Sequence, residues 1–153
     1  MRIRACALTL FLLSCSSIAQ EKERWERVYT LEDATIAMNS TRVELTEGAL
    51  GRVQFRWNFS KPQPVGDASD TKYKTRVETV EFNCSRRRYR LTAYTLLDSR
   101  GKSISSKELE PEELEWKFVK PGGMMERLLG PACRLIEEKR QSHRLPSTAK
   151  LIL

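Results

Sequence analysis

The chain has 153 residues, with 27 lysines and arginines against 20 aspartates and glutamates, and a formal net charge of +7. This length suits one domain with its own hydrophobic core and leaves too little chain for two. The charge is mildly basic, which is compatible with acidic polysaccharide, acidic proteins or anionic lipid headgroups as partners. With one histidine, a structural metal site of about four ligands is difficult to assemble.

The first 19 residues are predicted to be a secretory signal peptide. Arg2 and Arg4 precede the apolar run 5–13, and this order matches the n-region and h-region of such a signal. The run is far shorter than the about 20 residues that a transmembrane helix needs. Removal of the two arginines leaves 25 basic residues against 20 acidic ones, a net charge of +5.

Two processing routes remain open at the end of this signal. Residues 17–19 form a small-x-small site that would allow cleavage before Gln20, which we favour. Residues 12–15 resemble a bacterial lipobox, and lipidation of Cys15 would hold the protein on a membrane face. We therefore expect membrane association only if Cys15 is lipidated.

Alternation of apolar and polar residues with a period of two dominates the mature chain and predicts β-strands. The predicted strands are 25–30, 34–38, 41–45, 53–59, 73–84, 88–97 and 102–105. A polar segment rich in proline, glycine and serine, 61–70, is predicted to be a loop. The segment 85–87 connects two of the longest strands, and the turn 98–101 reverses the chain again.

Helical spacing appears only after the break at Pro121-Gly122-Gly123. The residues of the apolar stripe are Met125, Leu128, Leu129, Ala132, Cys133 and Ile136. Because Gly130-Pro131 interrupts this stripe, we expect a kinked or two-piece helix with Pro131 in the first turn of the second piece. The basic residues 141–153 are predicted to form a disordered tail.

Two cysteines remain after the predicted signal is removed, since Cys6 and Cys15 lie inside it. An exported chain enters an oxidising compartment, so Cys84 and Cys133 are predicted to form one disulfide. The alternative is two free buried thiols. In the predicted elements, Cys84 lies on the apolar face of a strand and Cys133 on the apolar stripe of the helix, so a bond would fasten the helix to the sheet.

No catalytic motif stands out in the sequence. Glycine-rich phosphate loops, G-x-S-x-G and H-E-x-x-H are absent, and His143 lies in the predicted tail, away from any shaped pocket that a general base needs. We therefore predict a protein that is not an enzyme and that has no cofactor, no metal site and no catalytic residue.

An arginine-rich segment is the sharpest candidate binding feature. Arg86, Arg87, Arg88 and Arg90 surround Tyr89, and guanidinium groups bind phosphates, sulfates and carboxylates bidentately. Export argues against nucleic acid as the ligand and favours acidic polysaccharide. The alternative is a hairpin turn whose arginines are solvated or paired with nearby glutamates, which contributes little to stability.

The order of several short segments resembles the bacterial surface-adhesin protein E family. These segments are Trp25, Val28-Tyr29, 33–36, 53–57, Val80-Glu81-Phe82-Asn83-Cys84 running into Arg87-Arg88-Tyr89-Arg90, Gly101, Trp116, and Pro121-Gly122-Gly123 leading through Glu126 and Leu129 to Cys133. The resemblance implies an antiparallel sheet with a C-terminal helix tied to it by the Cys84–Cys133 bridge. The resemblance also implies an envelope location. The best-known member of the family is a surface lipoprotein that binds host extracellular-matrix and serum proteins.

Together these patterns predict an α+β domain: an antiparallel sheet of about six strands with a C-terminal helix on one face, tied by one disulfide. The predicted division is a signal peptide at 1–19, the domain at 20–140 and the tail at 141–153. We expect an exported, non-enzymatic binding protein of the bacterial periplasm or outer-membrane surface, an adhesin for host matrix or serum proteins or acidic polysaccharide. The alternative is a soluble periplasmic accessory protein with a structural or lipid-related role. The sequence is also compatible with a homodimer.

Overall fold

The computed structural model describes residues 22–66 and 70–144. The predicted signal peptide with Cys15, and residues 145–153 of the predicted tail, lie outside the described residues. No helix within the described ranges is long and apolar enough to cross a membrane.

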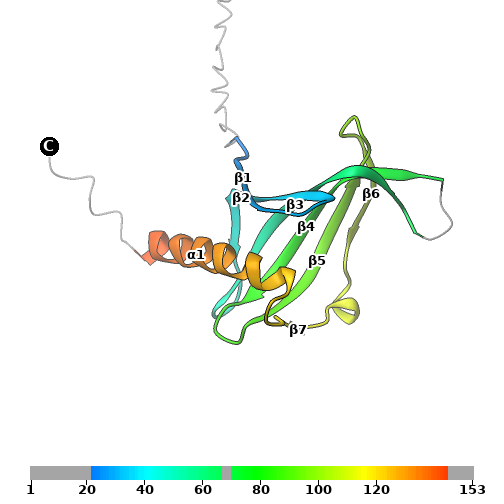
Figure 1. The fold of residues 1–153 in the computed structure, drawn as a ribbon. Helices are drawn as coiled ribbons and strands as arrows, with labels where there is room; N and C mark the ends of the chain where they lie inside the picture. Colours follow the sequence, from blue (N-terminus) through cyan, green and yellow to red (C-terminus); the bar gives the residue numbers. More distant parts are fainter. Residues whose placement is uncertain (1–21, 67–69, 145–153) are drawn as a thin grey trace, which may run out of the picture.

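One antiparallel sheet forms the body of the protein (Figure 1). Its long strands are β1 (Trp25–Thr30), β2 (Ala34–Leu45), β3 (Leu50–Pro64), β4 (Lys72–Asn83), β5 (Arg88–Leu97) and β6 (Ser103–Glu108). Each of these strands pairs with the next one along the chain, so the sheet is a meander. A two-residue strand, β7 (Lys117–Phe118), pairs with β5 beside β6. The predicted sheet of about six strands is therefore confirmed.

The predicted alternation sets the two faces of this sheet. Val53 pairs with Val43 on one side and with Val80 on the other, and directly opposed residues of neighbouring strands share a face. All three are buried, as are Phe55 and Phe82, whose rings meet edge to face with centroids 6.0 Å apart. We call this side the core face and the opposite side the arginine face.

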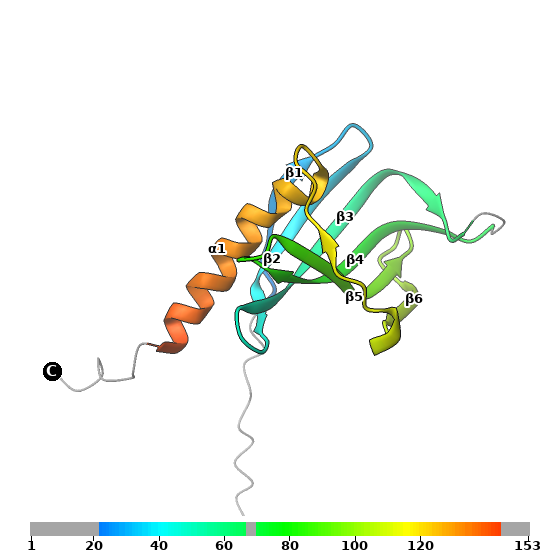
Figure 2. The same cartoon turned by 90° about the horizontal axis from the view of Figure 1, so that it is seen from below.

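The long helix α1 (Met124–Arg144) packs across the core face over the strands from β1 to β4 (Figure 2), and a one-turn 3-10 helix, η1 (Pro111–Glu113), lies between β6 and β7. Four residues of α1 are buried against the sheet: Leu128, Leu129, Ala132 and Ile136. The helix approaches so closely that Gly51 of β3 has no room for a side chain: an ideal Cβ there would lie 2.6 Å from Cγ1 of Ile136. Burial of this apolar stripe is the main non-covalent force that holds the helix in place.

The predicted disulfide is confirmed. Cys84 follows the last residue of β4, Cys133 lies in the middle of α1, and their Cα atoms are 5.8 Å apart across the bond. The bond therefore joins the end of a central strand to the helix that covers it.

The helix was predicted to be kinked or in two pieces, and the two-piece form was wrong, because α1 continues through Gly130 and Pro131 without a break (Figure 2). Proline in a helix interior costs about 3 kcal/mol, but apolar burial on both sides of Pro131, together with the disulfide, holds the helix through it. The helix also includes Gln141 to Arg144, so the predicted disordered tail was wrong for these four positions. His143 is an exposed residue of the last turn.

The strands predicted at 34–38 and 41–45 are one strand, β2, with a register shift between Met38 and Val43. The fully buried side chain of Asn39 organises this bulge. Its Oδ1 accepts hydrogen bonds from the backbone N–H groups of Thr41 and Arg42, at 3.1 and 3.2 Å, and from the Thr41 hydroxyl. A local side-chain bond thus bends the strand where the sequence indicated a break.

The segment predicted as a loop, 61–70, is partly strand, since β3 continues to Pro64 and pairs there with Lys72. The ring of Phe59 meets that of Tyr73 edge to face at 5.7 Å, which supports pairing beyond the main sheet. In Figure 1 the ends of β3 and β4 extend as a hairpin past the rest of the sheet.

Removal of the disulfide should destabilise the fold through the attachment of α1. We expect the Cys84→Ser/Cys133→Ser double variant to lose about 2 to 5 kcal/mol of unfolding free energy, the usual cost for a small disulfide-bonded domain. Urea unfolding followed by circular dichroism measures this. Reductant should destabilise the parent to the same level and leave the double variant unchanged; equal urea midpoints for parent and variant would contradict the prediction.

Candidate binding surfaces

A buried carboxylate with two arginines lies at the centre of the arginine face. Arg52, Glu81 and Arg90 are in register across β3, β4 and β5, and the Glu81 side chain is only 1% exposed. Arg52 Nε donates to Glu81 Oε1 at 3.2 Å, the Thr46 hydroxyl donates to the same oxygen at 3.0 Å, and Arg90 binds Oε2. A carboxylate buried to this degree requires such partners.

Three arginines stack on aromatic rings on this face. The guanidinium carbon of Arg90 lies 4.4 Å from the ring centre of Trp116, that of Arg88 lies 4.1 Å from Phe118, and that of Arg56 lies 4.6 Å from Trp25. Phe118 is 64% exposed, so one of these pairs is open to a partner. Such stacks are attractive because the ring face is electron-rich.

The four predicted arginines do not form one cluster. Arg88 and Arg90 point to the arginine face from alternate positions of β5. Arg87, in the turn with a φ of 49°, instead reaches the first turn of α1, where its guanidinium pairs with Glu126 at 2.7 Å. Arg86 is exposed in the same turn. Within the described ranges no carboxylate pairs with Arg86 or Arg88.

The arginine segment therefore divides into two paired and two unpaired residues among those that the structure describes. Arg87 and Arg90 are paired with glutamates, as expected for a hairpin turn of paired arginines, whereas no carboxylate of the described residues neutralises Arg86 or Arg88. Sequence reasoning missed the contribution of Arg52, Arg56 and the aromatic partners. Alternation places Arg52 and Glu81 on the polar side of their strands, but only the register between strands brings them together.

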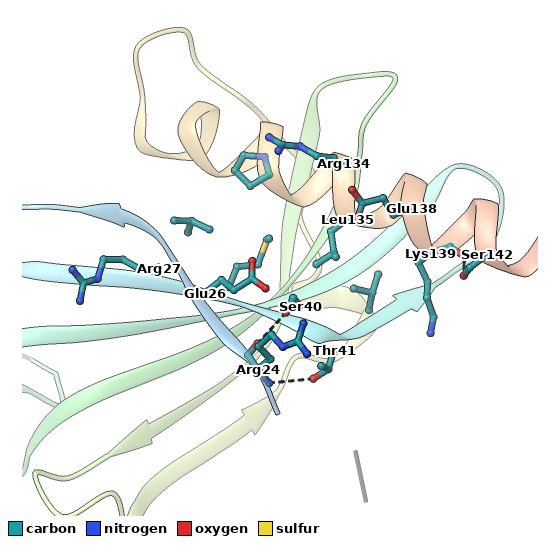
Figure 3. A pocket seen from close by; sticks show the side chains of 14 residues that line it. Arg24, Glu26, Arg27, Ser40, Thr41, Arg134, Leu135, Glu138, Lys139 and Ser142 are labelled. Carbon is teal, nitrogen blue, oxygen red and sulfur yellow. Dashed lines mark hydrogen bonds between the residues drawn. The ribbon is translucent and has the colours of Figure 1, made fainter. Parts of the chain in front are cut away.

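A groove on the other side of the molecule lies between α1 and strands β1 and β2, with a volume of about 710 Å³ (Figure 3). Its apolar lining is Val28, Met38, Val43, Pro131 and Leu135. Its charged lining is Arg24, Glu26, Arg27, Arg134, Glu138 and Lys139. In Figure 3 Lys139 is directed toward Thr41, next to Arg24, while Arg27 and Arg134 point away. The groove is amphipathic, with cations at one end of its mouth.

A second cavity, of about 450 Å³, lies on the core face beyond the start of α1 and contains Glu78. The indole N–H of Trp57 donates to Glu78 Oε2 at 2.9 Å, and Arg76 pairs with Oε1 at 2.7 Å. Burial raises the pKa of Glu78 above its usual value, although Arg76 and the Trp57 hydrogen bond act in the opposite direction. The described residues contain no group of three or more His, Cys, Asp or Glu side chains placed to hold a metal ion.

Neutralisation of Glu81 should destabilise the fold strongly. Glu81→Gln leaves Arg52 and Arg90 without their shared charge, and we expect a loss of about 2 to 4 kcal/mol, below the value for a fully buried pair because both arginines are partly solvated. The matched control is Glu44→Gln, which removes a 71% exposed carboxylate 3.8 Å from Arg52 and should cost less than about 1 kcal/mol. The urea midpoints of both variants measure these losses. Equal losses would show that the buried network contributes no more to stability than the exposed ion pair.

Comparisons with known proteins agree with this architecture. Residues 25–134 match the family model of surface-adhesin protein E. A structure of Haemophilus influenzae protein E is similar with a TM-score of 0.55 at 9% identity, over 74% of this chain and 86% of that one. A structure of protein E from non-typeable Haemophilus influenzae has a TM-score of 0.53 at 10% identity, over 78% and 89%.

At these identities the structural likeness shows the fold alone, and a comparison with curated proteins found no match. The family model, in contrast, covers the sheet from the start of β1 and continues into α1 past Cys133. On that match, the chain belongs to the surface-adhesin protein E family.

Proposed function

We propose that this chain is a non-enzymatic protein of the bacterial cell envelope that binds anionic groups on host matrix or serum proteins, or on acidic polysaccharide. The observation that carries the proposal is the arginine face, where Arg56 and Arg88 lie on aromatic rings and pair with no carboxylate of the described residues. Membership of a surface-adhesin family supports the same conclusion.

The stacking geometry explains why these arginines suit anionic partners. A ring against one face of a guanidinium restricts the side chain, so less conformational entropy is lost when a ligand binds. The N–H groups at the edge stay oriented for bidentate bonds to a carboxylate or sulfate. Arg86 adds an exposed cation in the adjacent turn. Export, by signal cleavage before Gln20 or lipidation at Cys15, would bring this face into contact with extracellular ligands.

The groove in Figure 3 favours a second candidate, a soluble periplasmic accessory protein with a lipid-related role. Its apolar lining, including Met38, Val43 and Leu135, suits an acyl chain, and Arg24 and Lys139 at the mouth suit an anionic headgroup. The volume of about 710 Å³ falls within the range of small-molecule sites.

Protease treatment of intact cells decides between the two candidates. A surface adhesin should be released or degraded by external protease, whereas a periplasmic protein should be degraded only after the outer membrane is permeabilised. Mass spectrometry of the mature N-terminus in the same fractions distinguishes Gln20 from a lipidated Cys15. Complete protection in intact cells would contradict surface display.

The pairing of the arginines predicts which substitutions weaken polyanion binding most. We expect Arg86→Gln/Arg88→Gln to elute from a heparin column at clearly lower salt than the parent, because both removed charges lack a carboxylate partner and exposed charges are screened by salt. The matched control is Arg87→Gln/Lys102→Gln, which removes the same net charge. Its elution should change less, because Arg87 is paired with Glu126 and Lys102 lies in the turn after the opposite end of β5. Equal shifts would mean that net charge alone governs retention.

A further inference from the structure

The cavity around Glu78 is formed by three separate parts of the chain. Helix α1 begins at Met124 and packs mainly against β1 to β4, so the core face continues uncovered beyond its first turn. Trp57 and Leu91 of the sheet line the cavity there. The segment between β6 and β7 provides the opposite wall, and Met124 and Met125 lie at the start of the helix. The cavity is thus separate from the arginine face, which lies on the other side of the sheet.

Carboxylates outnumber cations among the residues that line the cavity, in contrast to the protein as a whole. The charged lining of the cavity consists of three carboxylates, Glu78, Glu113 and Glu115, and one ammonium, Lys117, in a chain with a net charge of +7. Glu113 pairs with Lys107, which is not part of the lining. Glu115 makes no ion pair with any described residue. Charge complementarity therefore favours a cationic occupant.

Glu78 is the most buried of the three carboxylates that line the cavity. Its side chain is 15% exposed, and burial raises its pKa despite the neighbouring Arg76 and the Trp57 hydrogen bond. A carboxylate in this position gains from a further cation that replaces the lost water. Each carboxylate oxygen can accept two hydrogen bonds, so Oε2, which accepts one from Trp57, can accept a second.

The rest of the lining suits an alkyl chain. Trp57 and Leu91 offer an aromatic and an aliphatic surface beside Glu78. Met124 and Met125 are unbranched and flexible, which lets them adapt to an inserted group. The volume of about 450 Å³ is ample for one long side chain.

We propose that this cavity binds a lysine or arginine side chain presented by a partner polypeptide, with its alkyl stem against Trp57 and Leu91 and its cationic head at Glu78. This site is independent of anion binding by the arginine face and would give the protein a second, chemically opposite contact.

The test uses the oxidised mature protein and three small probes. Nα-acetyl-lysine methylamide carries the proposed group, its Nζ-acetylated form keeps the stem without the charge, and Nα-acetyl-glutamate methylamide reverses the charge. The indole N–H resonance of Trp57 in a ¹H–¹⁵N spectrum reports binding, because that group donates to Glu78. The lysine probe should shift it saturably, with the acetylated probe at least about fivefold weaker, as expected for loss of a charge-assisted hydrogen bond.

Variants locate the effect. Glu78→Gln should weaken binding of the lysine probe, and Glu115→Gln, an exposed change that leaves the core intact, should weaken it by a smaller factor. Glu138→Gln on α1 lies outside the cavity and serves as the charge-matched control with no effect. If the lysine and glutamate probes shift Trp57 equally, or if Glu115→Gln and Glu138→Gln behave alike, the proposal fails. Heparin elution of Glu115→Gln should not fall, so failure here is distinguishable from failure of the arginine face.

Discussion

The attachment of α1 to the core face is the contact on which the rest of the structure depends. The meander alone would leave one face apolar, with Ile36, Phe55 and Phe82 exposed, and such a face must be buried against another element. The helix covers that face through a stripe of buried side chains, and the Cys84–Cys133 bond fixes the position along the sheet at which it does so. The absence of a side chain at Gly51 allows the close approach of Ile136.

The place of the helix also determines where the binding surfaces lie. The groove of Figure 3 lies between α1 and the strands β1 and β2. The first turn of α1 forms one side of the Glu78 cavity. The buried Glu81 and the half-buried Glu78 show how this arrangement divides the molecule. Glu81, behind the sheet, is satisfied by two arginines and a threonine hydroxyl. Glu78, in front of it, has one arginine and one indole N–H, which leaves capacity for a ligand.

The fold could be predicted from the sequence where the signal was local or covalent. Alternation identified most of the strands, and the presence of two cysteines outside the predicted signal peptide identified the disulfide. Local signals failed where distant residues decide: Gly130 and Pro131 read as a break, but burial of residues on both sides keeps α1 continuous. The arginine segment was recognised, but which of its arginines are paired was not predictable. Arg87 meets Glu126, and Arg90 meets Glu81, only through the tertiary fold. The Glu78 cavity had no signature, since its walls come from distant segments.

Hydrogen exchange of the oxidised and reduced protein tests most directly whether the Cys84–Cys133 bond holds α1 on the sheet. Peptides from α1 and from the paired centres of β3 and β4 can be followed separately by mass spectrometry. Reduction should raise the exchange of α1 sharply, while the centres of β3 and β4, which pair over a long register, should keep more of their protection. Unchanged protection of α1 after reduction, or equal loss in α1 and in the two central strands, would contradict a helix whose place on the sheet depends on the Cys84–Cys133 bond.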